Sequence, residues 1–274
     1  MPSAKRPASS KPFPRRSAPV EVVDPRWLIK ALALSLLAAV ACCYATLCLL
    51  YSQGAWQLLL HPSHTIDRTP ASIGLTFSEV HFGASDTGQP RLTAWWVPAQ
   101  PQNGFASKYA AFTVLYLHDG SGSLSNTVPT LARLNQSGLN VFAIDYRGFG
   151  ASDASVHPSE TRMAEDAAAA FAYLATTRHI PPANIIPYGT GLGASLAVGL
   201  AHTHAELPAV ILDNPNPDPE ATAAAQSSHL LPARLLFGHP FEIAEPVATL
   251  TKPKLLIVGG LNSTRVTLTP TSLH

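Results

Sequence analysis

Residues 185–197 read IIPYGTGLGASLA, and this stretch decides the fold of the chain. The apolar run Ile185–Tyr188 is typical of a strand buried on both faces, and it leads directly into the glycine-rich turn Gly189–Gly193. An apolar helical pattern follows without a linker. A strand, a tight turn and a helix in this order are typical of parallel α/β sheets, whose functional residues lie beyond the carboxyl ends of the strands. The turn is therefore the first place to look for a site.

The same alternation of strands and helices continues on both sides of this turn. Two segments that alternate apolar and polar residues, Leu75–Phe82 and Arg91–Val97, predict an antiparallel pair. Short apolar runs predict buried strands at Phe112–Leu117, Asn140–Asp145, Ile185–Tyr188, Ala209–Leu212 and Leu255–Val258. Helical patterns lie between them at Thr130–Gln136, Ser159–Arg178 and Gly193–His204. The fold class is therefore α/β, with a mostly parallel sheet and helices on both faces.

The N-terminal part of the chain differs from the rest. Residues 1–26 are rich in Pro, Ser, Lys and Arg and predict a flexible basic tail. Ala31–Tyr51 carries no charge and would be about 31 Å long as a helix, enough to cross a bilayer core. We expect a transmembrane signal-anchor at residues 27–51 and a domain at 56–274. A cleaved signal peptide is the alternative.

The charge distribution predicts the orientation of this anchor. Most basic residues of this region precede the apolar stretch, so the N-terminus is expected in the cytoplasm and the domain in the periplasm. A net charge of +1, with charged residues at 13%, argues against a nucleic-acid partner. The three cysteines, Cys42, Cys43 and Cys48, all lie in the apolar stretch and form no disulfide framework. The sequence predicts no cofactor and no metal site.

Seven motifs, in their order and spacing, resemble the α/β-hydrolase family, and most closely its bacterial membrane-anchored members related to serine aminopeptidases and lipases. The resemblance covers about residues 56–258. It implies hydrolysis of esters or amides by acyl transfer through a serine. It also implies a further strand and helix after the last motif, so the domain is expected to be C-terminally short. The motifs are WQLLLHP (Trp56–Pro62), AWWVPA (Ala94–Ala99), LYLHDGSGS (Leu115–Ser123), NVFAIDYRGFGAS (Asn140–Ser152), IIPYGTGLGASLA (Ile185–Ala197), AVILDNP (Ala209–Pro215) and PKLLIVGG (Pro253–Gly260).

The resemblance places Gly191 where the G-x-S-x-G turn of the family carries its nucleophilic serine. Glycine has no side-chain oxygen, but it accepts the strained dihedrals of such a turn. The oxyanion-hole amides fall on Gly120 and Leu192. The position of the catalytic acid falls on Ser263, which is no carboxylate, and the histidine base is not found. The hypothesis is a catalytically impaired hydrolase, a pseudoenzyme.

Residues beside these positions receive structural interpretations. Asp119 stands where the family usually has glycine, and we expect its carboxylate to point to solvent or to cap its own loop. We expect His118 to close the end of its strand, and Asp145 and Arg147 to fix the loop beside the site. Asp213 is interpreted as a turn residue at the end of a strand.

Two alternatives remain open. The first is an active hydrolase with a displaced nucleophile, Thr190 or Ser195. The second is a dinucleotide-binding module, because Gly189, Gly191 and Ala194 also spell G-x-G-x-x-A and the carboxylate of Asp213 ends the next strand. As partners we expect the lipid bilayer, through residues 31–51, and an acyl or peptide ligand. The sequence identifies no protein partner.

Overall fold

The computed structural model describes residues 24–84, 88–101, 108–226 and 240–259. The chain divides into two compact units, residues 1–47 and 48–274. Helix α1 (Pro25–Gly54) includes the whole predicted span Ala31–Tyr51. Among the described residues, α1 is the one helix that is long and apolar enough to cross a bilayer. None of its side chains is buried by protein. The basic tail expected at residues 1–26 lies almost wholly outside the described residues.

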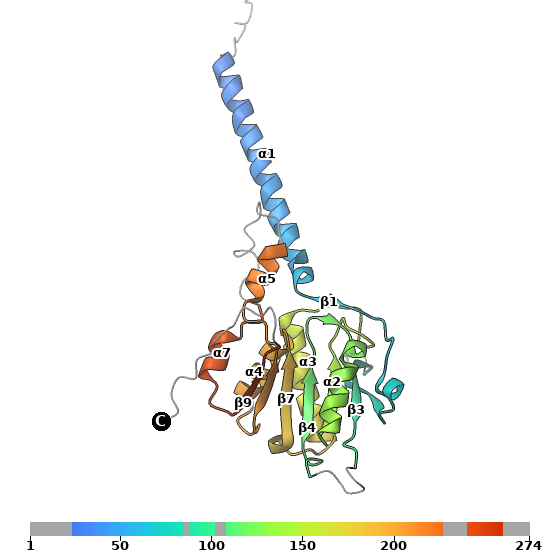
Figure 1. Cartoon of the computed structure of the whole chain (residues 1–274). Coiled ribbons are helices and arrows are strands. Elements are labelled where there is room, and N and C mark those ends of the chain that lie inside the picture. Colours follow the sequence, from blue (N-terminus) through green and yellow to red (C-terminus); the bar gives the residue numbers. More distant parts are fainter. Residues whose placement is uncertain (1–23, 85–87, 102–107, 227–239, 260–274) are drawn as a thin grey trace, which may run out of the picture. The chain divides into compact units, whose positions relative to one another are not determined.

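The second unit is built on a mixed sheet of seven strands among the described residues (Figure 1). Its strand order is β2-β3-β6-β4-β7-β8-β9, and only β3 runs opposite to the others. The antiparallel pair and the five parallel strands therefore confirm the prediction. The strands are β2 (Ser78–Ala84), β3 (Pro90–Val97), β4 (Thr113–Leu117), β6 (Asn140–Asp145), β7 (Ile185–Thr190), β8 (Val210–Asp213) and β9 (Lys254–Ile257).

Helices cover both faces of this sheet because successive side chains of a strand point to opposite faces. On one face, Val114 and Tyr116 of β4 pack in a cluster with α2. On the other face, Leu115 and Leu117 pack in a larger cluster with α3 and α4. The helices and short helical turns of this unit are η1 (Ala55–Leu58), η2 (Pro70–Ile73), α2 (Leu124–Gln136), α3 (Glu160–Ala172), η3 (Tyr173–Thr177), η4 (Pro182–Asn184), α4 (Gly193–Thr203), α5 (Pro219–Gln226) and α7 (Ala244–Thr249).

Helix α2 begins six residues earlier than the sequence pattern indicated, at Leu124 rather than at Thr130. Ser123 caps it: its Oγ accepts from the N–H of Ser125 at 3.3 Å, and its own N–H donates to Asn126 Oδ1 at 3.0 Å. Pro129 lies inside the helix, in its second turn. The proline made the start look like a loop, whereas the reciprocal cap stabilises a helical first turn.

The long helix predicted at Ser159–Arg178 is instead two elements. Ser159 caps α3 as expected, with Oγ accepting from the N–H of Arg162, but the regular helix ends at Ala172. A π-helical turn, η3, completes the segment. A single-turn π-helix widens the backbone spacing locally, a feature that no residue pattern in this Ala-rich segment signals.

A short parallel pair joins the segment after η1 to the loop after β4. Strand β1 (His61–Pro62) pairs with β5 (Ser121–Gly122), and the N–H of His61 donates to Gly120 O at 2.7 Å. The loop that follows β4 is therefore fixed at both its ends.

The cap of α2 provides a test of this fold. The substitution Ser123→Ala should lower the free energy of unfolding by about 1 kcal/mol, because the N–H of Ser125 loses its acceptor. Chemical denaturation of the chain measures the change. Ser137→Ala, at the exposed C-terminal end of the same helix, is the matched control and should change the value by less than about 0.5 kcal/mol. Equal effects at the two ends would contradict the capping role.

Candidate functional site

The glycine-rich turn connects β7 to α4 as the sequence predicted. Gly191 has φ +54°, in the left-handed region that favours glycine. A Cβ at Gly189 would meet the backbone of Ala194, and one at Gly193 would meet the carbonyl oxygens of Leu117 and His118. The two flanking glycines are therefore required by the close approach of β4, β7 and α4.

The backbone amides of Gly120 and Leu192 converge on one atom. The N–H of Gly120 donates to Asp119 Oδ1 at 2.7 Å, and the N–H of Leu192 donates to the same oxygen at 2.8 Å. Gly120 and Leu192 are buried, whereas Asp119 is exposed. The two amides that the sequence analysis selected thus form a pair, which is hereafter called the amide pair.

The expectation for Asp119 was incomplete. Its carboxylate caps its own loop through Gly120, as expected, but it also reaches across to the turn after β7. A Cβ at Gly191 would overlap this carboxylate. The side chain therefore lies over the amide pair, beside the position where the family carries its nucleophile, and sequence spacing alone gave no signal of its rotamer.

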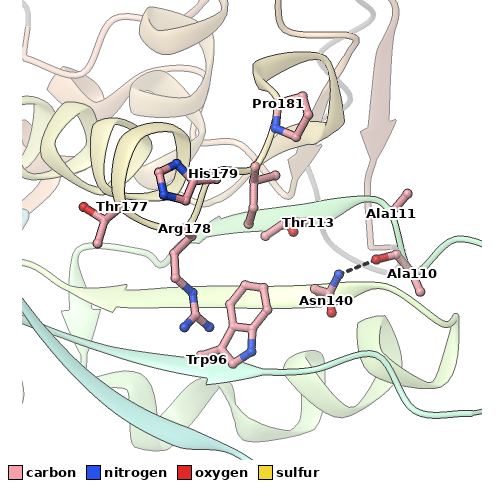
Figure 2. Close-up of a pocket in the computed structure, with 10 residues that line it drawn as sticks. Trp96, Ala110, Ala111, Thr113, Asn140, Thr177, Arg178, His179 and Pro181 are labelled. Carbon is pink, nitrogen blue, oxygen red and sulfur yellow. Dashed lines mark hydrogen bonds between the residues drawn. The ribbon is translucent and has the colours of Figure 1, made fainter.

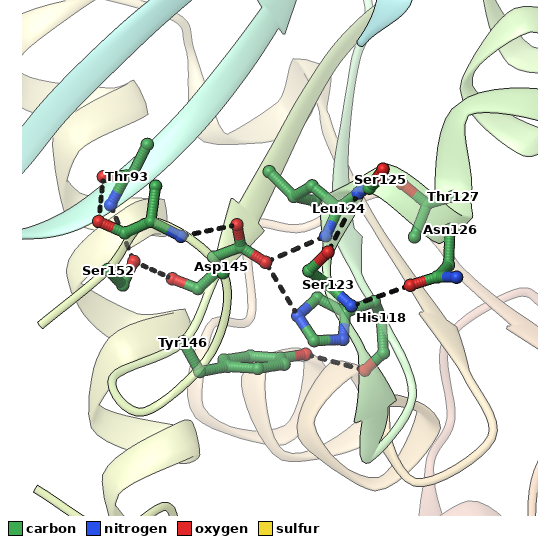
Figure 3. Close-up of polar contacts among 12 residues, drawn as sticks. Thr93, His118, Ser123, Leu124, Ser125, Asn126, Thr127, Asp145, Tyr146 and Ser152 are labelled. Carbon is green, nitrogen blue, oxygen red and sulfur yellow. Dashed lines mark hydrogen bonds and ion pairs between the residues drawn. The ribbon is translucent and has the colours of Figure 1, made fainter. Parts of the chain in front are cut away.

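His118 directly precedes this loop, and Figure 3 shows its ring facing Asp145 and its backbone oxygen bonded to Tyr146. Its ring is buried against Tyr146 and Phe149, and its Nδ1 lies 2.6 Å from Asp119 O. Because a carbonyl oxygen only accepts, Nδ1 carries the hydrogen. The hydroxyl of Tyr146 donates to His118 O at 3.0 Å, and burial raises the pKa of this phenol well above its ordinary value. His118 therefore closes the strand end, as predicted.

Asp145 fixes the neighbouring loop (Figure 3). Its Oδ1 accepts from the N–H of Leu124 at 2.9 Å and lies 3.6 Å from His118 Nε2, beyond hydrogen-bond distance. Its backbone oxygen accepts from Ser152 Oγ at 2.6 Å, and Ser152 in turn accepts from the N–H of Thr93 at 2.8 Å. The carboxylate thus ties the start of α2 to the end of β6.

Arg147 fixes the other side of the same loop. Its Nε donates to Asp166 Oδ1 of α3 at 2.6 Å, and its backbone N–H donates to Asp166 Oδ2 at 2.8 Å. A further bond reaches the exposed Glu165 at 2.6 Å. The predicted structural roles of Asp145 and Arg147 are confirmed.

The two hydroxyls considered as displaced nucleophiles are directed at other groups. Ser195 Oγ donates to Leu192 O at 2.8 Å, a bond back into the first turn of α4. The side chain of Thr190 lies close to the hydroxyl of Tyr116, whose pKa burial raises to about 12. Among the described residues, neither hydroxyl is hydrogen-bonded to a histidine, the base that activates such a nucleophile.

Asp213 ends β8, and its carboxylate is hydrogen-bonded to side chains of β7 and of the residue that follows it. Its Oδ2 accepts from the hydroxyl of Tyr188 at 2.7 Å, and its Oδ1 accepts from the side-chain amide of Asn214 at 2.8 Å. Burial and this carboxylate raise the pKa of Tyr188, so the phenol stays a donor. In a dinucleotide site the N-terminus of the helix would face pyrophosphate, but here the N–H of Leu192 faces Asp119. The geometry thus gives the dinucleotide alternative no support.

A pocket of about 480 Å³ lies at the opposite end of the sheet, where the parallel strands begin (Figure 2). Thr113 and Asn140 open β4 and β6, and both line it. The guanidinium of Arg178 stacks on the ring of Trp96 at 4.2 Å beside this pocket. Because the elbow lies at the carboxyl ends of the same strands, this pocket is separate from the amide pair.

The remaining position of the predicted site, Ser263, lies outside the described residues. Among the described residues, the carboxylate beside the amide pair is that of Asp119, and no histidine is hydrogen-bonded to it. Among the described residues, no cluster of His, Cys, Asp and Glu has the arrangement of a metal site.

Comparison with known proteins identifies a family that matches more than half of this chain. The family described as serine aminopeptidase, S33, matches residues 110–266. An uncharacterized protein of Mycobacterium tuberculosis is 32% identical over 170 residues, which are 62% of this chain and 57% of that protein. An α/β-hydrolase domain-containing protein of Arabidopsis thaliana is 28% identical over 53% of this chain and 45% of its own length. The chain thus spans about half the length of these relatives.

Solved structures resemble the fold. An esterase of Pyrococcus furiosus superposes with a TM-score of 0.54 at 22% identity, covering 73% of this chain and 77% of the esterase. An α/β-hydrolase of Vibrio vulnificus superposes with a TM-score of 0.52 at 24% identity, covering 68% of this chain and 64% of the hydrolase. At these identities the likeness concerns the fold alone.

A double-mutant cycle tests whether Asp119 lies over Gly191. Gly191→Ala alone should lower the free energy of unfolding by about 1–3 kcal/mol, because the new Cβ meets the carboxylate at a positive φ. In the background of Asp119→Ala the same substitution should cost less, with a coupling of at least about 0.5 kcal/mol. Chemical denaturation measures all four proteins. Gly199→Ala, in α4 with open space around its Cα, is the control and should show additivity with Asp119→Ala. Additivity at Gly191 as well would refute the contact.

Proposed function

Since the chain belongs to the serine aminopeptidase S33 family of α/β-hydrolases, we propose that it is a membrane-anchored member whose hydrolytic chemistry is impaired. The family's acyl transfer needs a nucleophile, a base that takes its proton and a pair of N–H donors for the oxyanion. This chain keeps the amide pair and the elbow backbone. It lacks the hydroxyl at Gly191.

The observation that carries this proposal is the backbone of the elbow at Gly191. Gly191 has a left-handed φ of +54° and lies between the close contacts of Gly189 and Gly193, but it has no side chain that could act as a nucleophile. The two neighbouring hydroxyls are directed at other groups, since Ser195 Oγ donates to Leu192 O and Thr190 lies close to Tyr116. Catalytic groups act as a unit, so the loss of the nucleophile alone removes most of the rate enhancement.

The role that remains is binding at the membrane. Helix α1 has the length and composition of a span, and its N-terminal side carries the basic residues expected in the cytoplasm. The domain would then face the periplasm and offer an acyl or peptide ligand the surface beyond the carboxyl ends of the strands. An active hydrolase that uses Thr190 or Ser195 is the competing function.

A fluorophosphonate probe separates these two functions. The full chain in detergent micelles should keep its unmodified intact mass, because residue 191 has no hydroxyl and, in the part of the chain that the structure describes, neither Thr190 nor Ser195 is bonded to a histidine. Circular dichroism must first show that the sample is folded, because an unfolded chain would also remain unmodified. A stoichiometric adduct would favour the displaced nucleophile, and its loss in Thr190→Val or in Ser195→Ala would identify which residue reacts.

The anchor has its own test. The full chain should remain in the membrane pellet after alkaline carbonate extraction. Ala41→Asp, near the centre of the apolar stretch, should release a large fraction, because a central carboxylate costs about 2.5–3.5 kcal/mol on insertion. Ser52→Asp, near the end of α1, is the matched control and should stay membrane-bound. Release of the unmodified chain, or equal release of both variants, would contradict the anchor.

Protease treatment of spheroplasts tests the orientation. A C-terminal tag should be digested and an N-terminal tag should be protected, because the basic residues keep the N-terminus in the cytoplasm. Digestion of the N-terminal tag with protection of the C-terminal tag would reverse the proposed topology.

A further inference from the structure

We propose that Asp119 is an internal ligand that keeps acyl groups out of this site. Its carboxylate takes the two backbone N–H groups that an acyl carbonyl oxygen would need. The inference rests on the proposed function, because it assumes that the amide pair is the one that faces the acyl group in hydrolytic members of the family. It adds that the site is closed by the chain itself, in addition to lacking a nucleophile.

The position of one oxygen atom carries the inference. Asp119 Oδ1 accepts from Gly120 and from Leu192 at 2.7 Å and 2.8 Å, distances of charge-assisted hydrogen bonds. Two N–H donors aimed at one oxygen are the arrangement that stabilises a developing oxyanion. A substrate carbonyl is neutral before attack, so it competes poorly for these donors against a carboxylate. The carboxylate also belongs to the same chain, which gives it a high effective concentration.

Gly191 and Asp119 depend on one another. A Cβ at residue 191 would overlap the carboxylate of Asp119 in its present position. A serine at the elbow and this rotamer therefore exclude each other. The two departures from the family pattern, glycine for serine at 191 and aspartate for glycine at 119, meet at one contact and are physically linked.

The loop that presents Asp119 is held rigidly, so the carboxylate is delivered to a fixed place. Gly120 O accepts from the N–H of His61, and a Cβ on Gly120 would meet the Leu192 side chain and the carbonyl oxygen of Leu59. His118, directly before Asp119, is buried and bonded to Tyr146 through its backbone oxygen. Asp119 itself is exposed, so its side chain can be shortened without opening a cavity in the core.

Formate is the probe that tests this inference. Asp119→Ala keeps the Cβ and removes the carboxylate, so the space left over the amide pair fits formate. The full chain in detergent micelles is melted in sodium formate and in sodium chloride at the same ionic strength. Asp119→Ala should gain thermal stability in formate in a saturable manner, and the wild-type chain should show no formate-specific gain. Asp153→Ala, which removes a carboxylate that accepts a single N–H at the surface, is the matched control and should also show none.

Amide hydrogen exchange gives the second readout, resolved at Gly120 and Leu192 by fragmentation in the mass spectrometer. Asp119→Ala should speed exchange at these two amides by about tenfold or more, since each loses a charged acceptor, and formate should restore the protection. The amide of Gly191, which donates to Asp213 O at 3.1 Å, reports on the fold of the turn and should change little. A missing formate effect in Asp119→Ala, or the same effect in all three proteins, would overturn the inference.

If Asp119→Ala does not fold, Asp119→Asn decides the matter. The carboxamide keeps the shape and one acceptor oxygen but not the charge. The two amides should then exchange several-fold faster than in the wild-type chain, with the rest of the domain unchanged, and equal rates would overturn the inference. These results are independent of the fluorophosphonate experiment. Labelling would overturn the impaired-hydrolase proposal, whereas an absent formate effect would leave that proposal standing.

Discussion

The parallel pairing of β4 with β7 is the constraint on which the rest of the structure depends. This pairing sets Leu117 opposite Gly189, so the two strands end at the same edge of the sheet. The loop at His118–Gly120 and the turn at Thr190–Gly193 then leave that edge side by side. Gly193 lies so close to the carbonyl oxygens of Leu117 and His118 that any Cβ there would overlap them. The amide pair exists because two backbones approach this closely, and the side chains only decide what occupies it.

The polar groups beneath this edge are buried and bonded mainly to backbone, although His118 Nε2 has no hydrogen-bond partner among the described residues. His118 bonds the oxygen of Asp119, Asp145 accepts the first N–H of α2, and Asp166 receives both a backbone and a side-chain donor of Arg147. Buried polar groups that lose a partner are costly, so such a network fixes the loops around the site. Among the described residues, this chain keeps the strand-turn-helix backbone of the α/β-hydrolase fold, while residue 191 is a glycine without a hydroxyl. The backbone contacts that hold the turn do not depend on a side chain at residue 191.

Much of the fold was predictable because it depends on periodicity. Buried parallel strands need continuous apolar runs, and the runs at Asn140–Asp145 and Ile185–Tyr188 marked β6 and β7 to within two residues. The errors lie in the helices. Pro129 hid the first turn of α2, whose stability comes from the reciprocal bonds of Ser123 and Asn126. The end of α3 was missed because the π-helical turn at Tyr173–Thr177 depends on backbone geometry rather than on an apolar period.

For the candidate site, the sequence by itself determined which atoms are absent. A glycine at residue 191 has no hydroxyl in any conformation, and the order of the motifs placed this glycine at the elbow and selected Gly120 and Leu192 as the amide pair. Only the tertiary structure decided where the carboxylate of Asp119 lies. Its neighbours in the sequence allow it to face solvent, whereas Leu192, 73 positions away, supplies the N–H that holds it over the elbow. The type of residue at a position is given by the sequence. The direction of its side chain depends on hydrogen-bond donors that lie far away in the sequence and that folding brings close.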